Sequence, residues 1–176
     1  MTNLLQNEKG ALYMKKIWYY EFSTKDKKIS AYRLGIAETD GAISHILFES
    51  KNSFPGYAPE ETPLIKTAAL QLFEYFYGKR AEFELPLSPK GTLFQQAVWT
   101  ALKNIPFGET RSYKQIAEQI GNPKAVRAVG MANNRNPVPI IVPCHRVIGT
   151  NGELVGYAGG LDFKQALLDL EKSKKH

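Results

Sequence analysis

The stretch SYKQIAEQIGNPKAVRAVGMANN, residues 112–134, decides how the second half of this chain folds. Ser112 and Gln115 have the spacing of a capping box, which predicts the start of a short helix. The Gly-Asn-Pro of residues 121–123 stops that helix, and a second helix is expected from about Lys124 to Asn133. Two short helices joined by a tight turn that contains glycine are typical of a helix-turn-helix.

The second of these helices carries small side chains beside two basic ones. Small residues let a helix lie close to a partner, which fits close packing in the core as well as it fits a DNA groove. Lys124 and Arg127 on the same helix favour the groove. The small residues are Ala125, Ala128, Gly130 and Ala132.

Further helices and a strand are expected around this motif. Thr92 and Gln95 form another capping-box pair, which predicts a helix through Lys103. Residues 140–142 are three aliphatic residues and read as a short strand, whereas residues 161–171 have the spacing of an amphipathic closing helix. The second half is therefore expected to be mostly helical.

The first half has the pattern of an antiparallel sheet with one helix. Strands are expected over residues 16–22, 30–37, 42–48 and 83–85, with Asp40-Gly41 as a hairpin turn. Thr62 can cap a helix that has Pro63 in its first turn and stops at Gly78. The fold class is therefore α+β: a small N-terminal α/β domain over residues 1–87, followed by a helical C-terminal domain over residues 88–176.

The net charge of +6 lies entirely in the second half. Residues 1–89 contain 11 basic and 11 acidic residues, whereas residues 90–176 contain 12 basic and 6 acidic residues. Six of the basic residues lie between positions 111 and 146, a stretch that could neutralise phosphates. They are Arg111, Lys114, Lys124, Arg127, Arg135 and Arg146.

The cysteine content and the hydropathy of the chain argue against a disulfide-linked, metal-clustered or membrane-spanning protein. One cysteine cannot form an internal disulfide, and with three histidines it offers no metal cluster. No run approaches the ~18 apolar residues that a membrane span needs, and the N-terminus lacks the order of a secretory signal. We expect a reduced, cytoplasmic protein with no membrane segment.

The single cysteine, Cys144, reads either as a small buried hydrophobe or as a nucleophile. A reactive thiol needs a group that takes its proton, and His145 is next in the chain. Neighbouring side chains of a strand point to opposite faces, so the backbone must turn sharply here or a water must bridge the two groups. A carboxylate behind the imidazole could be Glu171, with Asp162 and Asp169 as alternatives.

The segment around Cys144 resembles the active-site signature of the O6-alkylguanine-DNA alkyltransferases, also called methylated-DNA–protein-cysteine methyltransferases. Asn136 begins a run of Asn-Pro-Val-Pro, three aliphatic residues and Pro-Cys-His-Arg-Val. Further family-like segments follow one another in the right order, so the similarity covers about residues 90–171. These segments are IPFGE at 105–109, SY at 112–113, RAVG at 127–130 and GYAGGL at 156–161.

The resemblance implies a role for each residue of the catalytic group. Cys144 would accept the alkyl group, His145 would act as its base through a water, and Glu171 would orient His145. Asn136 would tie the recognition helix to the active-site segment by hydrogen bonds. The family's zinc-containing members use cysteine ligands, which a chain with one cysteine cannot supply. No metal and no cofactor are expected.

The resemblance also implies how damaged DNA would be held. Arg127 would fill the space left by a flipped nucleotide, and Tyr113 would crowd the 3′ phosphate and contact the guanine. Backbone groups of Cys144 and Val147 would read the base edge, with Tyr157 and Ala158 closing the pocket. The small Ala158 would leave room for alkyl groups larger than methyl. Further DNA contacts are expected from Ser112, Lys124, Ala125 and Arg135.

The implied function is stoichiometric DNA repair by a cytoplasmic monomer. The alkyl group of O6-alkylguanine, and of O4-alkylthymine, would pass from double-stranded DNA held through its minor groove to Cys144, which inactivates the protein. Two alternatives stay open: a non-catalytic sensor of alkylated bases, and a Cys-His acyl-transfer enzyme unrelated to DNA. The sensors lack the acceptor cysteine, and the acyl-transfer enzyme would not need the basic helix pair.

Overall fold

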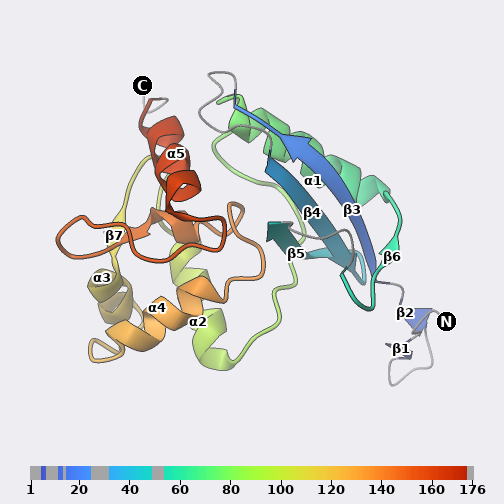
Figure 1. Ribbon diagram of the computed structural model, residues 1–176. Coiled ribbons are helices and arrows are strands. Elements are labelled where there is room, and N and C mark those ends of the chain that lie inside the picture. The colour runs from blue at the N-terminus through green and yellow to red at the C-terminus, as the bar shows by residue number, and fades with distance from the viewer. Residues whose placement is uncertain (1–4, 7–11, 14, 25–31, 49–53, 174–176) are drawn as a thin grey trace. The chain divides into compact units, whose positions relative to one another are not determined.

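The structure of this protein is a computed structural model that describes residues 5–6, 12–13, 15–24, 32–48 and 54–173. The chain divides into two compact units, residues 1–89 and 90–176. The first unit contains an antiparallel sheet and one long helix, and the second contains short helices (Figure 1). The predicted α+β fold class is confirmed.

The sheet of the first unit has the order β5-β4-β3-β6. The strands β3 (Lys16–Phe22), β4 (Tyr32–Thr39) and β5 (Ala42–Phe48) are antiparallel, and β6 (Ala58–Pro59) runs parallel to β3. Asp40 and Gly41 have φ values of 56° and 75°, as the predicted two-residue hairpin requires. Residues 30 and 31 of the expected second strand lie outside the described residues. A separate pair joins β1 (Leu5–Gln6) and β2 (Leu12–Tyr13).

Helix α1 (Pro63–Phe76) lies along one face of this sheet (Figure 1). The hydroxyl of Thr62 accepts a hydrogen bond from the Ile65 N–H, so the predicted cap is confirmed. The Phe22 ring of β3 lies 4.4 Å and 5.4 Å, between centroids, from the rings of Phe73 and Phe76. Aromatic packing therefore attaches the helix to the sheet.

The strand expected over residues 83–85 is not formed, so that prediction is wrong. The side-chain amide of Gln71 on α1 accepts from the Glu84 N–H at 2.9 Å and donates to the Glu84 carbonyl at 3.1 Å. One side chain thus satisfies the backbone groups that a neighbouring strand would otherwise pair. The next backbone pairing along the chain is an isolated β-bridge between Leu87 and Ile43.

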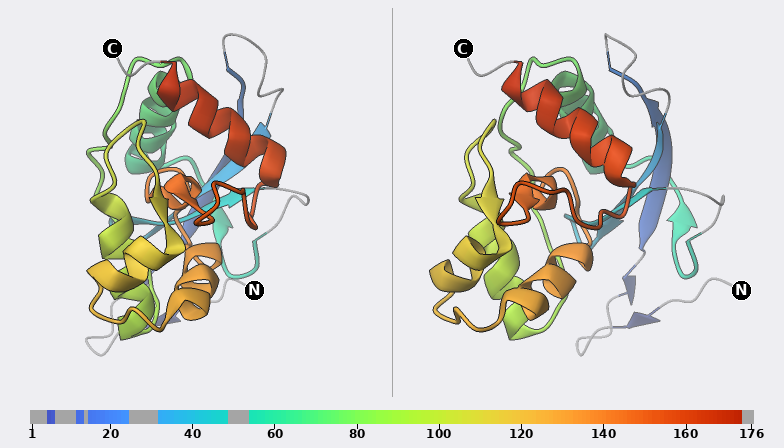
Figure 2. Two further views of the ribbon diagram at one scale, coloured as in Figure 1. Left: turned by 90° about the vertical axis from the view of Figure 1, so that its left-hand side faces the viewer. Right: turned by 60° about the vertical axis from the view of Figure 1, so that its left-hand side comes forward.

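Three helices of the second unit pack against one another (Figure 2). They are α2 (Leu93–Lys103), α3 (Tyr113–Gln119) and α4 (Val126–Asn134), and both predicted capping boxes are present at α2 and α3. Helix α4 begins two residues later than expected, because the Ala125 N–H bonds to the Asn122 carbonyl in a turn. Helices α3 and α4 pack together as the predicted helix-turn-helix.

The strand expected over residues 140–142 is also absent, because prolines at positions 137, 139 and 143 lack the N–H groups that a ladder needs. The segment makes a compact turn instead, closed by a 2.9 Å hydrogen bond from the Val142 N–H to the Val138 carbonyl. A 3₁₀-helix η1 (Cys144–Arg146) and strand β8 (Val147–Ile148) follow, and β8 pairs with β7 (Arg111–Ser112).

The chain closes with α5 (Leu161–Lys172), one residue longer than expected. Its buried side chains Phe163, Leu167 and Leu168 form its inner face. None of the described helices is both long and apolar enough to cross a bilayer.

Candidate active site

Cys144 is the first residue of η1, and only 3% of its surface is exposed. Its surroundings are polar and not purely aliphatic. The side chain of Asn136, the positive charge of Lys164 and the backbone N–H groups of Cys144 and Ile140 all act to lower the pKa of the thiol. The thiol is therefore buried among groups that stabilise a negative charge.

Burial raises the pKa of the Cys144 thiol to about 11, although these polar groups act in the opposite direction. The thiol is accordingly protonated at neutral pH. Its use as a nucleophile requires a base close by.

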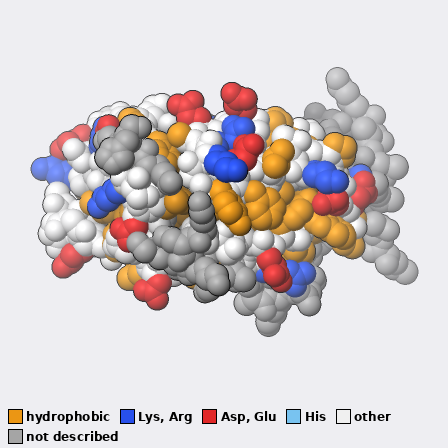
Figure 3. All heavy atoms as spheres, turned by 90° about the horizontal axis from the view of Figure 1, so that it is seen from above, with side chains coloured by type: hydrophobic (Ala, Val, Ile, Leu, Met, Phe, Trp, Pro, Cys, Tyr) orange, Lys and Arg blue, Asp and Glu red, His pale blue; other side chains and the backbone are white. Residues whose placement is uncertain are grey.

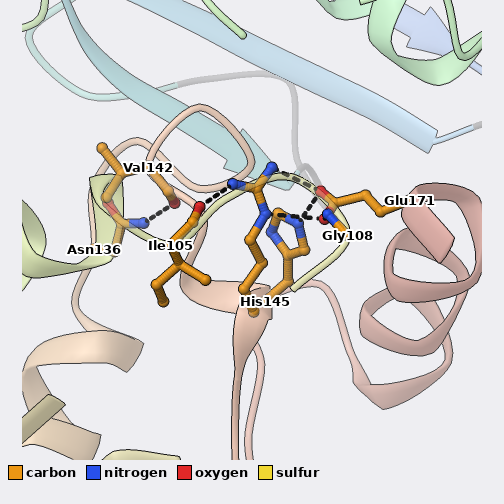
Figure 4. A network of polar contacts seen from close by, with 7 residues as sticks. Ile105, Gly108, Asn136, Val142, His145 and Glu171 are labelled. Atoms are coloured by element: carbon orange, nitrogen blue, oxygen red, sulfur yellow. Dashed lines mark hydrogen bonds and ion pairs between the residues drawn. The ribbon is translucent and has the colours of Figure 1, made fainter. Parts of the chain in front are cut away.

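His145, the residue after Cys144, forms a hydrogen-bonded pair with Glu171 (Figure 4). The His145 Nε2–H donates to Oε1 of Glu171 at 2.7 Å, and both side chains are fully buried. Of the three carboxylates considered above, Glu171 is therefore the one that contacts the imidazole. Asp169 instead accepts from the exposed Gln165, and Asp162 is exposed.

Arg146 holds the other side of the Glu171 carboxylate. Its Nε donates to Oε2 at 2.9 Å and its Nη2 to Oε1 at 3.0 Å, while the Gly108 N–H donates to Oε2 at 3.0 Å. A third guanidinium nitrogen donates to the Ile105 carbonyl. The expectation that Arg146 belongs to a phosphate-binding stretch is therefore wrong, since this side chain is buried in an ion pair.

These hydrogen bonds and charges determine the protonation states of Glu171 and His145. Burial alone raises the pKa of Glu171, but the hydrogen bonds and charges of His145 and Arg146 together outweigh it and hold the pKa well below its usual range. Burial lowers the pKa of His145 more than Glu171 raises it. The pair at neutral pH is a carboxylate next to a neutral imidazole that can accept a proton.

The 3₁₀ geometry of η1 explains how adjacent residues can face one site. Successive side chains of a 3₁₀-helix are about 120° apart, not on opposite faces as in a strand. Cys144 and His145 both lie on this turn. The sharp turn that the sequence required of an active Cys-His pair is thus present.

Two asparagines at the end of α4 support the turn. Asn136 donates to the Val142 carbonyl at 2.8 Å (Figure 4) and accepts from the Val138 N–H at 3.0 Å. Asn133, which the sequence did not single out, donates to the Cys144 carbonyl at 3.3 Å. Its buried Oδ1 has no hydrogen-bond partner within the described part of the chain.

Lys164 is a further residue of the site that the sequence did not indicate. It lies fully buried on α5, and its ammonium donates to the carbonyls of Val147 at 2.7 Å and Val155 at 3.0 Å. Burial lowers its pKa to about 8, opposed by the charge of Cys144. A lysine on an amphipathic helix reads as exposed, so no local pattern could have revealed this position.

Tyr113, at the start of α3, lies next to Lys164 and shares one of its hydrogen-bond acceptors. Its ring lies 6.0 Å from the Lys164 ammonium, and its hydroxyl donates to the Val155 carbonyl at 3.2 Å. Burial, and secondly the charge of Cys144, raise the pKa of Tyr113. Helices α3 and α5 therefore bring a phenol and an ammonium to the thiol.

The remaining predicted residues lie on or beside the helix-turn-helix, on β8 or in the segment before α5. Lys124, Arg127 and Arg135 are exposed on or beside α4, whereas Ser112 caps α3 and Ala125 precedes α4. The Val147 carbonyl already accepts from Lys164. Tyr157 is half-buried and stacks on Phe163 with 6.2 Å between ring centroids, and Ala158 is exposed.

Comparisons with known proteins agree with this arrangement. Residues 93–173 match the family described as 6-O-methylguanine DNA methyltransferase, DNA binding domain. A methylated-DNA–protein-cysteine methyltransferase of Methanosarcina mazei is 50% identical over 83% of this chain and 94% of its own length.

Two solved structures are similar along nearly the whole chain. The O6-methylguanine methyltransferase of Mycobacterium tuberculosis is 43% identical, with a TM-score of 0.78 over 91% of this chain and 95% of the other. A structure of Mycobacterium tuberculosis OGT in complex with DNA is 46% identical, with a TM-score of 0.78 over 89% and 94% of the two chains.

Proposed function

Because this chain belongs to the methylated-DNA–protein-cysteine methyltransferase family, we propose that it repairs DNA by moving an alkyl group from a damaged base to Cys144. The substrates are O6-alkylguanine and O4-alkylthymine in double-stranded DNA. The observation that carries this proposal is a single buried thiol beside the hydrogen-bonded pair of His145 and Glu171.

The thiol is activated by proton transfer to His145. Nε2 of His145 is held by Glu171, so Nδ1 is the ring nitrogen that takes the proton, through a bridging water. The carboxylate stabilises the imidazolium that forms. The thiolate then stands among donors from Asn136 and the backbone, with the Lys164 charge nearby.

Alkyl transfer is an in-line displacement at the alkyl carbon. The S–C bond forms while the bond from carbon to the base oxygen breaks, and the base takes up a proton. Tyr113 stabilises the charge that develops on the leaving base. Its hydroxyl exchanges the Val155 carbonyl, its present acceptor at 3.2 Å, for the base.

DNA binds through its minor groove to the helix-turn-helix of α3 and α4. The target nucleotide leaves the stack at a cost of a few kcal/mol, since a base inside a duplex cannot reach a buried sulfur. Arg127 on the exposed side of α4 fills the vacated space, and Lys124 and Arg135 neutralise phosphates. In the view of Figure 3, basic and acidic side chains are interspersed.

The product is a thioether, which has no carbonyl for water to attack. We therefore expect one turnover per molecule. We also expect the protein to act as a monomer.

The test is transfer of labelled methyl from O6-methylguanine DNA to the wild type and to Cys144→Ala. One methyl group per protein, found on Cys144 by mass spectrometry and missing in the variant, supports the proposal. Binding to the lesion without transfer would instead identify a sensor. Acylation by an activated ester together with inertness toward alkylated DNA would identify an acyl-transfer enzyme.

A further inference from the structure

The main-chain carbonyl of Cys144 is held by two donors that come from different parts of the chain. The Val147 N–H donates to it at the end of η1, and the Asn133 side-chain amide donates to it at 3.3 Å. Asn133 is 2% exposed and Cys144 is 3% exposed, so this contact is shielded from bulk water. Helix α4 therefore contacts the reactive residue itself.

Asn133 acts at a different place from Asn136. Asn136 bonds to Val138 and Val142, which precede the cysteine in the chain. Asn133 bonds to the carbonyl of Cys144, on the far side of its Cα. The family resemblance implies a role for Asn136 and none for Asn133.

The Asn133 amide is a fixed donor, because the last turn of α4 is held from two sides. The indole N–H of Trp99, on α2, donates to the Ala132 carbonyl at 2.9 Å. The Asn136 N–H donates to the Asn133 carbonyl at 3.3 Å. Trp99 and Ala132 are each 2% exposed, so this turn is packed as well as hydrogen-bonded.

The opposite side of α4 is exposed. Arg127, Met131 and Arg135 follow one another at intervals of four residues, which places them on one face. Asn133 comes two residues after Met131, about 200° further around the helix, and is buried. The exposed face is the one that docks on DNA in the proposed function. One short helix therefore has this face on one side and the main chain of Cys144 on the other.

Stability alone does not account for an amide at position 133. Its Oδ1 is buried and has no hydrogen-bond partner among the residues that the structure describes. A buried acceptor without a partner destabilises the folded state, whereas an apolar group of the same shape does not. Leucine has the same branched arrangement of side-chain atoms. What asparagine offers here and leucine lacks is the donor to Cys144.

We propose that Asn133 is a positioning residue that ties the main chain of Cys144 to α4, so that docking of this helix on DNA fixes the place of the sulfur. An in-line displacement needs the sulfur aligned with the alkyl carbon, and a misplacement of about 1 Å can slow such a reaction about 100-fold. The tie itself is measured without DNA. Its link to docking rests on the proposed function.

Two variants remove the donor, and a third is the control. Asn133→Leu removes the amide and keeps the branched shape of the side chain. Asn133→Ala removes the amide without adding methyl groups, and it gives the same readouts if leucine does not fit. The matched control is Asn104→Leu, the same change at an exposed residue that follows α2 and lies outside the helix-turn-helix.

The first measurement is the ¹³C resonance of the Cys144 carbonyl. Labelling of cysteine at this carbon gives a single resonance, because the chain has one cysteine. Both Asn133 variants should shift it upfield, since the carbonyl loses one of its two hydrogen bonds, and Asn104→Leu should leave it in place. A resonance at the wild-type position in both Asn133 variants would overturn the inference.

Undamaged duplex DNA tests whether docking reaches this carbonyl. At saturation the DNA should move the Cys144 resonance of the wild type and of Asn104→Leu, and it should move that of the Asn133 variants less. DNA affinity should stay within about twofold in all of them, because the buried Asn133 side chain contacts no phosphate. A wild-type resonance that stays in place when DNA is bound would overturn the link.

Reactivity separates positioning from packing. Single-turnover methyl transfer should be about 10- to 100-fold slower in Asn133→Leu. Iodoacetamide needs no such alignment, so its rate of reaction with Cys144 should stay within about threefold. Urea unfolding should show Asn133→Leu to be at least as stable as the wild type. Lower stability together with faster iodoacetamide labelling in both Asn133 variants would show a packing role and overturn the inference.

The outcomes distinguish this inference from the proposed function. A wild type that cannot repair damaged DNA, together with a shifted carbonyl resonance in the Asn133 variants, would refute the function alone. Normal repair by every variant together with an unshifted resonance would refute the role of Asn133 alone.

Discussion

Nε2 of His145 donates a 2.7 Å hydrogen bond to Oε1 of Glu171, although the two residues lie 26 positions apart. One is on the 3₁₀ turn and the other near the end of the closing helix. The same carboxylate accepts from Arg146 and from the Gly108 backbone. Glu171 therefore joins several segments of the unit and holds the imidazole that we propose as the base.

Glu171→Gln is expected to slow alkyl transfer and to destabilise the protein. The amide cannot balance the buried Arg146 guanidinium, and loss of one partner of a buried ion pair costs about 3–5 kcal/mol. Urea unfolding and single-turnover methyl transfer measure the two effects. Asp169→Asn on the same helix is the control, with an expected change within about 0.5 kcal/mol; equal effects of the two variants would contradict the assignment.

The contribution of Glu171 should depend on pH in a defined direction. Its pKa in the folded state is held well below the usual range. The stabilisation is therefore complete above the unfolded pKa of about 4.3 and is lost progressively as the pH falls below it. Unfolding free energies from about pH 3 to 7 should show the wild type and Glu171→Gln converging in acid, and parallel curves would disprove this.

Cys144 should produce the opposite dependence at high pH. Its pKa rises from 9.0 to about 11 on folding, so the folded state keeps a proton that the unfolded state releases. The wild type should lose stability relative to Cys144→Ala between about pH 9 and 11, by roughly 2–3 kcal/mol in total. Denaturation of both proteins at several alkaline pH values tests this, and a constant difference would argue against a buried, protonated thiol.

Lys164→Met is expected to make the Cys144 thiol less reactive, because the nearby positive charge lowers its pKa. The buried Val147 carbonyl also loses its donor, which costs about 1–3 kcal/mol. Iodoacetamide kinetics and urea unfolding measure both effects. The exposed Lys172→Met, at the end of the same helix, should behave like the wild type; unchanged thiol kinetics in Lys164→Met would show that the charge does not act on the sulfur.

Substitution of the exposed basic residues on and beside α4 should weaken DNA binding and reduce its salt dependence. Removing one cation that neutralises a phosphate reduces the slope of log K against log salt by about 0.9. We expect this for Lys124→Ala and Arg135→Ala, and not for Lys103→Ala, which lies on α2. Arg127→Ala should slow methyl transfer more than it weakens initial binding. Titrations of each variant with DNA at several salt concentrations measure the slopes. If Lys103→Ala reduced the slope as much as Lys124→Ala does, the attraction of DNA would not be specific to α4.

Local patterns in the sequence were sufficient for much of the fold. The capping boxes at Thr92 and Ser112 and the Asp40-Gly41 turn act within three or four residues, so they can be recognised without any knowledge of the rest of the chain. The motif around Cys144 likewise identified the family. The strands expected over residues 83–85 and 140–142 were wrong, because a glutamine side chain and three prolines determine how those backbone groups are paired.

The sequence by itself determined the N-terminal caps of α1, α2 and α3, the hairpin turn and the position of the single thiol, since these depend on neighbouring residues. Only the tertiary structure decided that Arg146 pairs with Glu171, that Lys164 is buried and that Ile140 adopts a left-handed backbone conformation. The physical reason is burial. A charge or a strained backbone is retained only where distant segments supply its partners, and those segments meet only when the chain folds.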